Sequence, residues 1–372
     1  MKRDNGFCHA SLASTKRPLN VLVVDDSAVV RQVLTGVLSA DSRLSVTVSP
    51  DAIIAMRKMK NVRPDVIVLD LEMPRMNGLT FLQRIMAHDP IPVVVCSGLA
   101  GPGTDSAVRA LEHGAVAIIN KPEIGVRGFL EDSAVMLIDT VLGAAGAKVV
   151  TSPPRRLTAD VMLPARSALS LPATARRVIA IGASTGGTEA LRVILASMPI
   201  ETPGIVIVQH MPEVFTKSFS RRLNETCRIE VKEAENGDQV LKGRALIAPG
   251  NRHMMIHRNR DEYFVEVVDG PLVSRHRPSA DVLFRSVAQS AGPGAVGAIL
   301  TGMGDDGADG LMEMKLAGAA TIAQDEATCV VFGMPKEAIS RGAVDRVVAL
   351  PDVAKTIVEL TNARPQYRRP CA

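Results

Sequence analysis

The stretch VIAIGASTGG at residues 178–187 places Ser184 directly after an apolar run that is typical of a buried strand. Two further apolar runs end in a similar way: His210 follows residues 205–208, and Asp306 follows residues 296–300. In an open parallel α/β sheet, functional residues gather outside the carboxyl ends of the strands. We therefore expect the serine, the histidine and the aspartate to meet as nucleophile, base and orienting carboxylate.

Outward from this stretch, apolar runs alternate with amphipathic segments from residue 178 to about residue 361. Residues 244–249 and 252–268 alternate like short strands, so we expect a mostly parallel α/β domain with an antiparallel edge. The first half of the chain has the same rhythm. Its expected strands are 21–24, 44–48, 66–69, 93–96 and 116–119, and its expected helices are 29–38, 53–59, 79–86 and 106–111. This pattern predicts a second doubly wound domain, whose parallel sheet is covered on both faces.

Residues 144–176 are rich in proline, serine and arginine and show no period, which indicates a linker. We expect a disordered extension at 1–17, domains at 18–143 and 177–362, and a tail at 363–372.

The chain has 372 residues and a net charge of +4. It has no apolar run long enough to span a membrane and no basic stripe with interleaved aromatics, so we expect neither a membrane span nor nucleic-acid binding. Its 5 scattered cysteines favour free thiols in a reducing cytoplasm.

Five polar residues follow strands of the first domain: Asp25, Asp26, Asp70, Ser97 and Lys121. Any one of them could simply cap the helix that follows. Together at one sheet edge, the carboxylates would repel one another unless a cation lay among them, and hard oxygen ligands suit Mg²⁺. The ion would neutralise a phosphoryl group on Asp70, while Ser97 and Lys121 would contact its oxygens.

The segment around Ser184 fits the Gly-x-Ser-x-Gly nucleophile elbow, in which small residues allow a sharp turn from strand to helix. The match alone is weak, because glycine-rich turns are common in α/β proteins. A dinucleotide-binding turn would need glycine where the serine stands. The order Ser, His, Asp also differs from that of the α/β-hydrolase fold, so a triad here would belong to another scaffold.

The other histidines are weaker candidates. His253 and His257 have the spacing of zinc ligands, but Met254 occupies the place of the required glutamate and the stretch alternates like a strand. His276 lies in the loop sequence SRHRPS and is a candidate to face the substrate.

With these residues in place, residues 18–142 resemble the receiver domain of two-component response regulators. The resemblance implies that Asp70 is the phospho-acceptor, that Asp25 and Asp26 are the acidic pair that binds Mg²⁺ with it, and that Ser97 and Lys121 are the conserved hydroxyl and lysine. One departure is Ile118, which stands where receivers usually carry an aromatic switch residue.

The second domain resembles the protein-glutamate methylesterases of bacterial chemotaxis, the CheB family. The matching stretches are 182–187, 209–212, 247–250, 275–281, 301–307, 324–326 and 333–335. The resemblance places the acid on Asp306 rather than on Asp305, where many relatives have asparagine. It also implies that backbone N–H groups, including that of Met303, hold the oxyanion.

The two resemblances together imply a phosphorylation-activated hydrolase of glutamate γ-methyl esters on chemoreceptors, with glutamine deamidase activity. A chemotaxis histidine kinase would be the phosphodonor, and the esterase site would need no cofactor. We expect a monomer. Two alternatives are a non-catalytic regulator gated by the receiver and a DNA-binding regulator. The second would require a basic helix-turn-helix after the linker, where an α/β segment stands instead.

Overall fold

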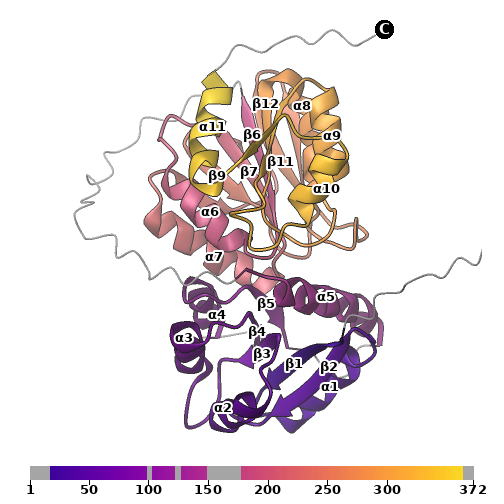
Figure 1. Cartoon of the computed structure of the whole chain (residues 1–372). Coiled ribbons are helices and arrows are strands. Elements are labelled where there is room, and N and C mark those ends of the chain that lie inside the picture. Colours follow the sequence, from indigo (N-terminus) through magenta and orange to yellow (C-terminus); the bar gives the residue numbers. More distant parts are fainter. Residues whose placement is uncertain (1–16, 99–102, 122–126, 149–176, 363–372) are drawn as a thin grey trace, which may run out of the picture.

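The computed structural model describes residues 17–98, 103–121, 127–148 and 177–362. Most of the expected extension, most of the expected linker and all of the expected tail lie outside these described residues. The described chain forms two α/β units, drawn one above the other in Figure 1.

The first unit is a five-stranded parallel sheet with the strand order β2-β1-β3-β4-β5. Its strands are β1 (Leu19–Val24), β2 (Leu44–Ser49), β3 (Val66–Asp70), β4 (Val93–Ser97) and β5 (Ala117–Asn120). Its helices are α1 (Ala28–Leu38), α2 (Ala52–Asn61), α3 (Gly78–His88), α4 (Gly103–Glu112) and α5 (Arg127–Ala145).

Alternate residues of the central strands enter two different cores, one on each face of the sheet. Leu22 packs into a core with residues of α2, α3 and α4, whereas Val23 packs into a core with residues of α1 and α5. Because both faces are covered, the strands read as continuous apolar runs, as expected from the sequence. Helix α5 is not among the helices that the apolar spacing predicts. It carries apolar residues toward the sheet and also faces the second unit, so no single apolar stripe marks it.

The second unit has a seven-stranded sheet with the order β14-β13-β12-β6-β7-β9-β8, and all its pairings are parallel. The strands are β6 (Val178–Ala183), β7 (Gly204–Gln209), β8 (Glu230–Glu233), β9 (Arg244–Ile247), β12 (Ala295–Ile299), β13 (Ala320–Gln324) and β14 (Arg346–Val348). The helices are α6 (Gly187–Ala196), α7 (Glu213–Thr226), α8 (Ala280–Ala291), the short 3₁₀ helix η1 (Gly292–Gly294), α9 (Ala308–Leu316), α10 (Met334–Ser340) and α11 (Leu350–Asn362).

The antiparallel strands expected in this domain form a separate two-stranded sheet, β10 (His253–Asn259) and β11 (Glu262–Val268), rather than an edge of the large sheet. This hairpin packs on α8, where the Ile256 N–H donates a hydrogen bond of 3.0 Å to Ser286 Oγ. The alternating stretch at 244–249 contains β9, which instead runs parallel to β7 in the large sheet.

Strand β6 lies between β12 and β7, so three neighbouring strands end at one sheet edge. From β6 the chain continues to β7 on one side, and it later returns to β12 on the other side. Such a point, where the strand order reverses, leaves a crevice outside the carboxyl ends of the strands. The sheet therefore brings the residues that follow β6, β7 and β12 to one place.

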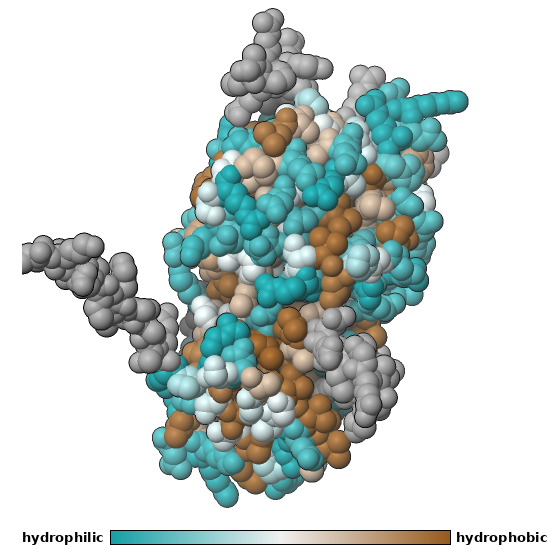
Figure 2. Space-filling model, turned by 90° about the vertical axis from the view of Figure 1, so that its right-hand side faces the viewer, coloured by the Kyte–Doolittle hydropathy of each residue, from teal (hydrophilic) through white to brown (hydrophobic). Residues whose placement is uncertain are grey.

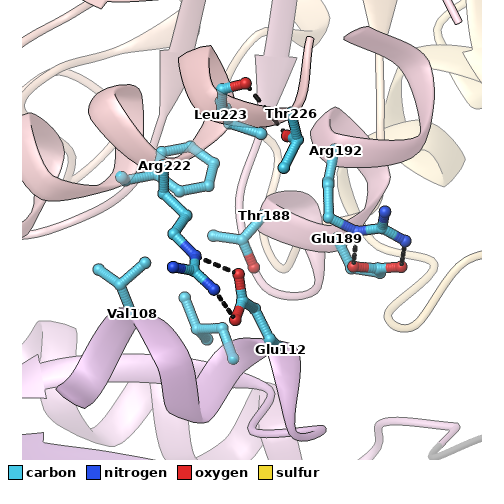
Figure 3. A pocket seen from close by; sticks show the side chains of 10 residues that line it. Val108, Glu112, Thr188, Glu189, Arg192, Arg222, Leu223 and Thr226 are labelled. Carbon is cyan, nitrogen blue, oxygen red and sulfur yellow. Dashed lines mark hydrogen bonds and ion pairs between the residues drawn. The ribbon is translucent and has the colours of Figure 1, made fainter. Parts of the chain in front are cut away.

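The two units contact each other on this side of the second sheet, where the strands have their carboxyl ends. Helix α4 packs on α7, where Arg222 makes two hydrogen bonds to Glu112, of 2.6 and 2.8 Å (Figure 3). The Gly186 N–H also donates to the Val116 carbonyl at 3.2 Å, which joins the backbones of the two units. On the face drawn in Figure 2, apolar residues lie at the junction amid a mostly hydrophilic surface.

A cavity of about 640 Å³ lies at this junction. Ile118 and Leu137 line it from the first unit, and Ser184, His210 and Met303 line it from the second. The two units pack closely at Gly143 of α5. A β-carbon added at Gly143 would lie 2.7 Å from Met303 Sδ and 3.1 Å from Met303 Cβ, so this glycine permits the close packing of α5.

We therefore predict that Gly143→Leu loosens the contact between the two units, because its side chain would occupy the space of Met303. Amide hydrogen exchange should become faster in residues 137–145 and 301–307. Gly36→Leu in α1 is the matched control, since a β-carbon there meets nothing within 4 Å. Equal exchange in the two variants would contradict this packing role.

Candidate active site

Ser184 is the first residue after β6 and is fixed through its backbone. Its N–H donates to the Thr301 carbonyl at 3.0 Å, and its carbonyl accepts from the Gly187 N–H at 2.7 Å and from Gln209 Nε2 at 2.9 Å. Gly186 then starts α6 with a φ of 78°, a left-handed conformation that favours glycine. The serine thus lies on a tight turn that is hydrogen-bonded to both neighbouring strand ends.

Gly302 allows the loop after β12 to pass against the serine. A β-carbon at Gly302 would lie 2.7 Å from Ser184 Cβ, and closer still to Met334 Sδ. The Thr301 hydroxyl also donates to the Thr185 carbonyl at 3.0 Å. The serine elbow and the loop that carries Asp306 are therefore packed as one structure.

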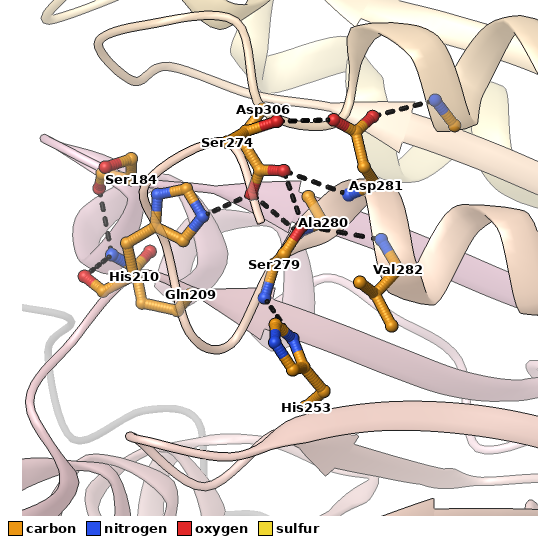
Figure 4. A network of polar contacts seen from close by, with 11 residues as sticks. Ser184, Gln209, His210, His253, Ser274, Ser279, Ala280, Asp281, Val282 and Asp306 are labelled. Carbon is orange, nitrogen blue, oxygen red and sulfur yellow. Dashed lines mark hydrogen bonds and ion pairs between the residues drawn. The ribbon is translucent and has the colours of Figure 1, made fainter. Parts of the chain in front are cut away.

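His210 is the first residue after β7, and its ring lies between Ser184 and Asp306 (Figure 4). Its Nε2 lies 2.7 Å from Asp306 Oδ2, and its side chain is 7% exposed. Its Nδ1 is also buried and has no hydrogen-bond partner among the described residues. The Ser184 hydroxyl therefore does not donate to His210 in this form, and Nδ1 is the ring nitrogen left to act as a base.

Asp306 is fully buried, and its carboxylate is surrounded by donors at the start of α8 (Figure 4). Ser279 Oγ donates to Oδ1 at 2.6 Å, and the Ala280 N–H donates to Oδ2 at 2.7 Å. The Asp281 N–H adds a third contact at 3.2 Å. Burial alone would raise the pKa of Asp306, but the hydrogen bond and charge of His210, together with Ser279 and Ala280, lower it to about 2. The carboxylate is therefore ionised at neutral pH.

The adjacent Asp305 points elsewhere. Its carboxylate pairs with Arg341 at 2.9 Å, and its side chain is 46% exposed. Adjacent residues in this loop thus face different partners, and Asp306 is the one that reaches His210.

The ring of His276 stacks on one face of the His210 ring. The ring centroids are 3.8 Å apart and the planes differ by 11°. Burial, together with the charge of His210, lowers the pKa of His276 to about 3, so this ring is neutral at neutral pH. The stacked neutral ring restrains the plane of the His210 imidazole.

Met303 lies in the loop between Thr301 and Asp306 and lines the same cavity as Ser184. Its backbone N–H has no hydrogen-bond acceptor among the described residues. A carbonyl oxygen of a substrate placed in the cavity could accept from it.

Several residues that support the site were not predicted from the sequence. Ser279 is the N-cap of α8, and its hydroxyl serves both the helix and Asp306. A serine that precedes an amphipathic run is a recognisable N-cap signal, but its second role depends on the tertiary fold. Gln209 and Thr301 tie the strand ends together and carry no local signal.

His253 is a structural residue: its Nε2 lies 2.7 Å from the Pro271 carbonyl, and its Nδ1 accepts from the Ser279 N–H at 3.3 Å.

The polar residues of the first domain meet at the edge of its own sheet. Asp25, Asp70 and Ser97 are buried, and Lys121 Nζ lies 2.7 Å from Asp70 Oδ2 and 3.3 Å from Asp25 Oδ2. Burial raises the pKa of Asp70, against the hydrogen bond and charge of Lys121. Burial also disfavours the charged form of Lys121, but Asp70 and Asp25 outweigh it and keep the pKa of this amine above its ordinary value.

These carboxylates fit a divalent cation. One oxygen from each of Asp25, Asp26 and Asp70 lies within 4.8 Å of the others. Asp25 Oδ2 is buried, and in the described structure it is ion-paired with the Lys121 amine at 3.3 Å without a well-formed hydrogen bond, so this oxygen could also ligate a metal. Carboxylate oxygens with room for water are the ligands that Mg²⁺ prefers.

Ile118, at the position of the usual aromatic residue, is buried in β5 and lines the cavity that contains Ser184.

None of the described helices has both the length and the apolar character needed to cross a bilayer.

The comparisons with known proteins cover both units. Residues 21–126 match the response regulator receiver domain, and residues 179–357 match the CheB methylesterase domain. The chain is 54% identical over 352 residues to a protein-glutamate methylesterase/protein-glutamine glutaminase of Geobacter metallireducens. The alignment covers 92% of this chain and 99% of that relative. A protein of the same name from Anaeromyxobacter dehalogenans is 56% identical over 347 residues, covering 91% and 98%.

Two solved structures from Thermotoga maritima are also similar. The CheB methylesterase catalytic domain is 38% identical with a TM-score of 0.49, covering 50% of this chain and 98% of that one. The response regulator domain of CheB is 34% identical with a TM-score of 0.32, covering 36% and 99%. With the CheB methylesterase model matched over about half of the chain and relatives matched over nearly all of it, this chain belongs to the CheB family of receiver-linked protein-glutamate methylesterases.

Proposed function

We propose that this protein hydrolyses glutamate γ-methyl esters, and deamidates glutamine side chains, on chemoreceptors in the cytoplasm, and that phosphorylation of Asp70 controls the reaction. The domains would be residues 18–143 and 177–362, joined by a linker at 144–176. The observation that carries this proposal is the ionised Asp306 bound to His210 Nε2. The other ring nitrogen, Nδ1, is left without a partner among the described residues, and His210 lines the same cavity as Ser184. The names of the relatives at 54% and 56% identity support the substrate class.

In the proposed mechanism, rotation of the Ser184 hydroxyl toward His210 Nδ1 begins the reaction. Nδ1 takes the hydroxyl proton while Oγ forms a bond to the ester carbonyl carbon. Asp306 accepts from the Nε2–H throughout, which fixes the tautomer and stabilises the imidazolium that forms. The atoms are those of a serine–histidine–aspartate triad with the two ring nitrogens in exchanged roles.

The tetrahedral intermediate would place its oxyanion beside the loop at residues 302–304. The Met303 N–H is the donor that we assign to it. When the carbon–oxygen bond to the leaving group breaks, the imidazolium gives its proton to the departing methoxide oxygen, and methanol leaves. Water, deprotonated by His210, then attacks the acyl-enzyme and yields glutamate and free Ser184. An amide substrate would follow the same path and release ammonia.

In the receiver, Asp25, Asp26 and Asp70 would hold Mg²⁺, which supplies positive charge to offset an incoming phosphoryl group. Asp70 would accept the phosphoryl group from a chemotaxis histidine kinase, and Ser97 and Lys121 would contact its oxygens. In the form described here α5 covers the cavity that contains Ser184. We infer that phosphorylation shifts the protein from this docked state to a released one.

Replacing the nucleophile should stop the chemistry without unfolding the protein. Ser184→Ala is expected to lower the rate of methanol release from methylated receptor membranes by at least about a thousandfold, as for other triads. Ser340→Ala, an exposed serine at the end of α10, is the matched control and should leave the rate unchanged. If Ser184→Ala retains activity within tenfold of the unmodified protein, the assignment of Ser184 as nucleophile is wrong. The alternative of a non-catalytic regulator would instead be favoured if the unmodified protein released no methanol.

The adjacent acids should behave differently. Asp306→Asn is expected to lower the maximal rate at least about tenfold more than Asp305→Asn, because an amide beside His210 can stabilise the wrong tautomer. Asp305 contacts Arg341 instead, so its replacement should be mild. Rates would be compared with the phosphodonor present and circular dichroism used to check folding. A larger loss for Asp305→Asn would mean that the acid has been misassigned.

Control by the receiver should depend on one carboxylate. Mg²⁺ with a small phosphodonor should raise methanol release by the full chain, and Asp70→Asn should abolish this rise while the basal rate stays the same. Asp89→Asn, an exposed acid of the same domain, should still respond. A fragment that begins at Arg177 should be active without a donor. If that fragment is no faster than the unphosphorylated full chain, the receiver does not inhibit by covering the site.

A further inference from the structure

An ion pair joins the loop beside the active site to the receiver helix that covers it. Arg275 Nη1 lies 2.8 Å from Asp139 Oδ2 on α5, and the two side chains are 55% and 23% exposed. The arginine belongs to the catalytic domain and the aspartate to the receiver, so this pair exists only while the two domains are docked.

The loop holds Arg275 in a defined position. Ser274 and Arg275 have φ values of 50° and 66°, which are uncommon for residues other than glycine and persist only where the surroundings enforce them. Ser274 Oγ donates to Asp281 Oδ2 at 3.0 Å, and Val273 and His276 exchange backbone hydrogen bonds of 3.0 and 2.8 Å. The guanidinium therefore projects from a constrained turn.

This turn places a positive charge in the lining of the cavity that contains Ser184. The next residue, His276, stacks on His210, and Arg275 lines the same cavity as Ser184. The Arg275 Nη2 atom lies 4.0 Å from the point where a β-carbon would stand on Gly304, beside Met303. A group bound to this guanidinium would therefore lie in or at the mouth of the cavity that Ser184 lines.

The other cations that line the cavity are held by groups of their own domain. Lys121 is paired with Asp70 and Asp25. Arg277 donates to Asn251 Oδ1 and to the Gly270 carbonyl. Arg275 differs, because the carboxylate that binds it in the described structure belongs to the receiver. That carboxylate would move away if the two domains separated.

We propose that Arg275 is a specificity residue that binds a carboxylate of the substrate protein near the scissile ester, and that Asp139 occupies this site in the docked state. The inference rests on the proposed function and adds to it the charge of the preferred substrate, an acidic segment. Each turnover leaves a glutamate carboxylate on the substrate, so a segment with several modification sites gains negative charge as it is processed. The planar fork of arginine matches a carboxylate, and its charge is permanent.

The test uses the full chain with Mg²⁺ and a saturating small phosphodonor. Two synthetic helical peptides each carry one glutamyl γ-methyl ester, flanked at the positions three and four residues away by glutamate in the first and by glutamine in the second. Unmodified protein, Arg275→Gln and Arg258→Gln are compared by methanol release. Arg258 is a matched control, because it is half exposed in the same domain and pairs with Asp261 on the hairpin, not with the receiver.

We expect Arg275→Gln to lower kcat/KM for the acidic peptide at least about tenfold, mainly through KM, because a charge-assisted hydrogen bond is lost. The value for the neutral peptide should change by less than about twofold, since no carboxylate is bound there. Arg258→Gln should match the unmodified protein on both peptides. Equal losses on the two peptides, or no loss on the acidic one, would overturn the proposal and leave the proposed function standing. If the unmodified protein releases methanol from neither peptide, the proposed function fails and this inference fails with it.

A second variant tests the role of the receiver. Asp139→Asn should raise methanol release from the acidic peptide in the absence of phosphodonor, because Arg275 is no longer occupied. With phosphodonor it should retain the preference of the unmodified protein for the acidic peptide. If the basal rate does not rise, Asp139 does not compete with substrate for Arg275.

Discussion

The catalytic domain depends on the burial of one ionised carboxylate. An isolated buried charge is strongly unfavourable, so Asp306 requires donors on several sides. They come from the N-terminus of α8, where Ser279 and two backbone N–H groups point at the carboxylate, and from His210 after β7. The partial positive charge of the helix N-terminus acts in the same direction. The loop after β12, the start of α8 and the end of β7 are thereby held in one arrangement, and that arrangement leaves His210 Nδ1 without a hydrogen-bond partner among the described residues.

The same sheet edge is the surface on which the receiver docks. The N–H of Gly186, two residues after Ser184, donates to the receiver backbone, and Met303 packs against Gly143 of α5. The groups that would perform the chemistry are thus in contact with the groups that would regulate it. Separation of the domains would open the cavity, release Arg275 and free Met303 in one step. This coupling explains how a change at Asp70, at the edge of a different sheet, could reach the esterase site without any long relay.

The positions of the functional residues could be predicted from the sequence because each follows an apolar strand, and strand ends of a parallel sheet converge. That reasoning predicts Ser184, His210 and the receiver residues, and the structure brings each group together. The choice between Asp305 and Asp306 could not be made in this way. It depends on side-chain direction in a tight loop, which spacing does not encode, and the family resemblance supplied it.

Other features depended on tertiary context. Helix α5 contacts both the receiver sheet and the catalytic domain, so it lacks the single apolar stripe that marks a surface helix. The alternating pattern of β10 and β11 indicates two strands but not the sheet to which they belong. Ser279 shows an N-cap signal, yet its contact with Asp306 arises only when α8 meets the loop after β12. The stacking of His276 on His210 likewise joins residues that are far apart in sequence.

The central claim is that Ser184 is a nucleophile activated by His210 and covered by the docked receiver. The most direct measurement is the rate at which an organophosphonate that reacts with activated serines labels the full chain, with the labelled residue identified by mass spectrometry. The account predicts one modified residue, Ser184, labelled slowly without phosphodonor and faster with Mg²⁺ and phosphodonor. Labelling of Ser184 at the same rate in both conditions would contradict the covering of the site. The absence of any label on Ser184 would contradict its activation.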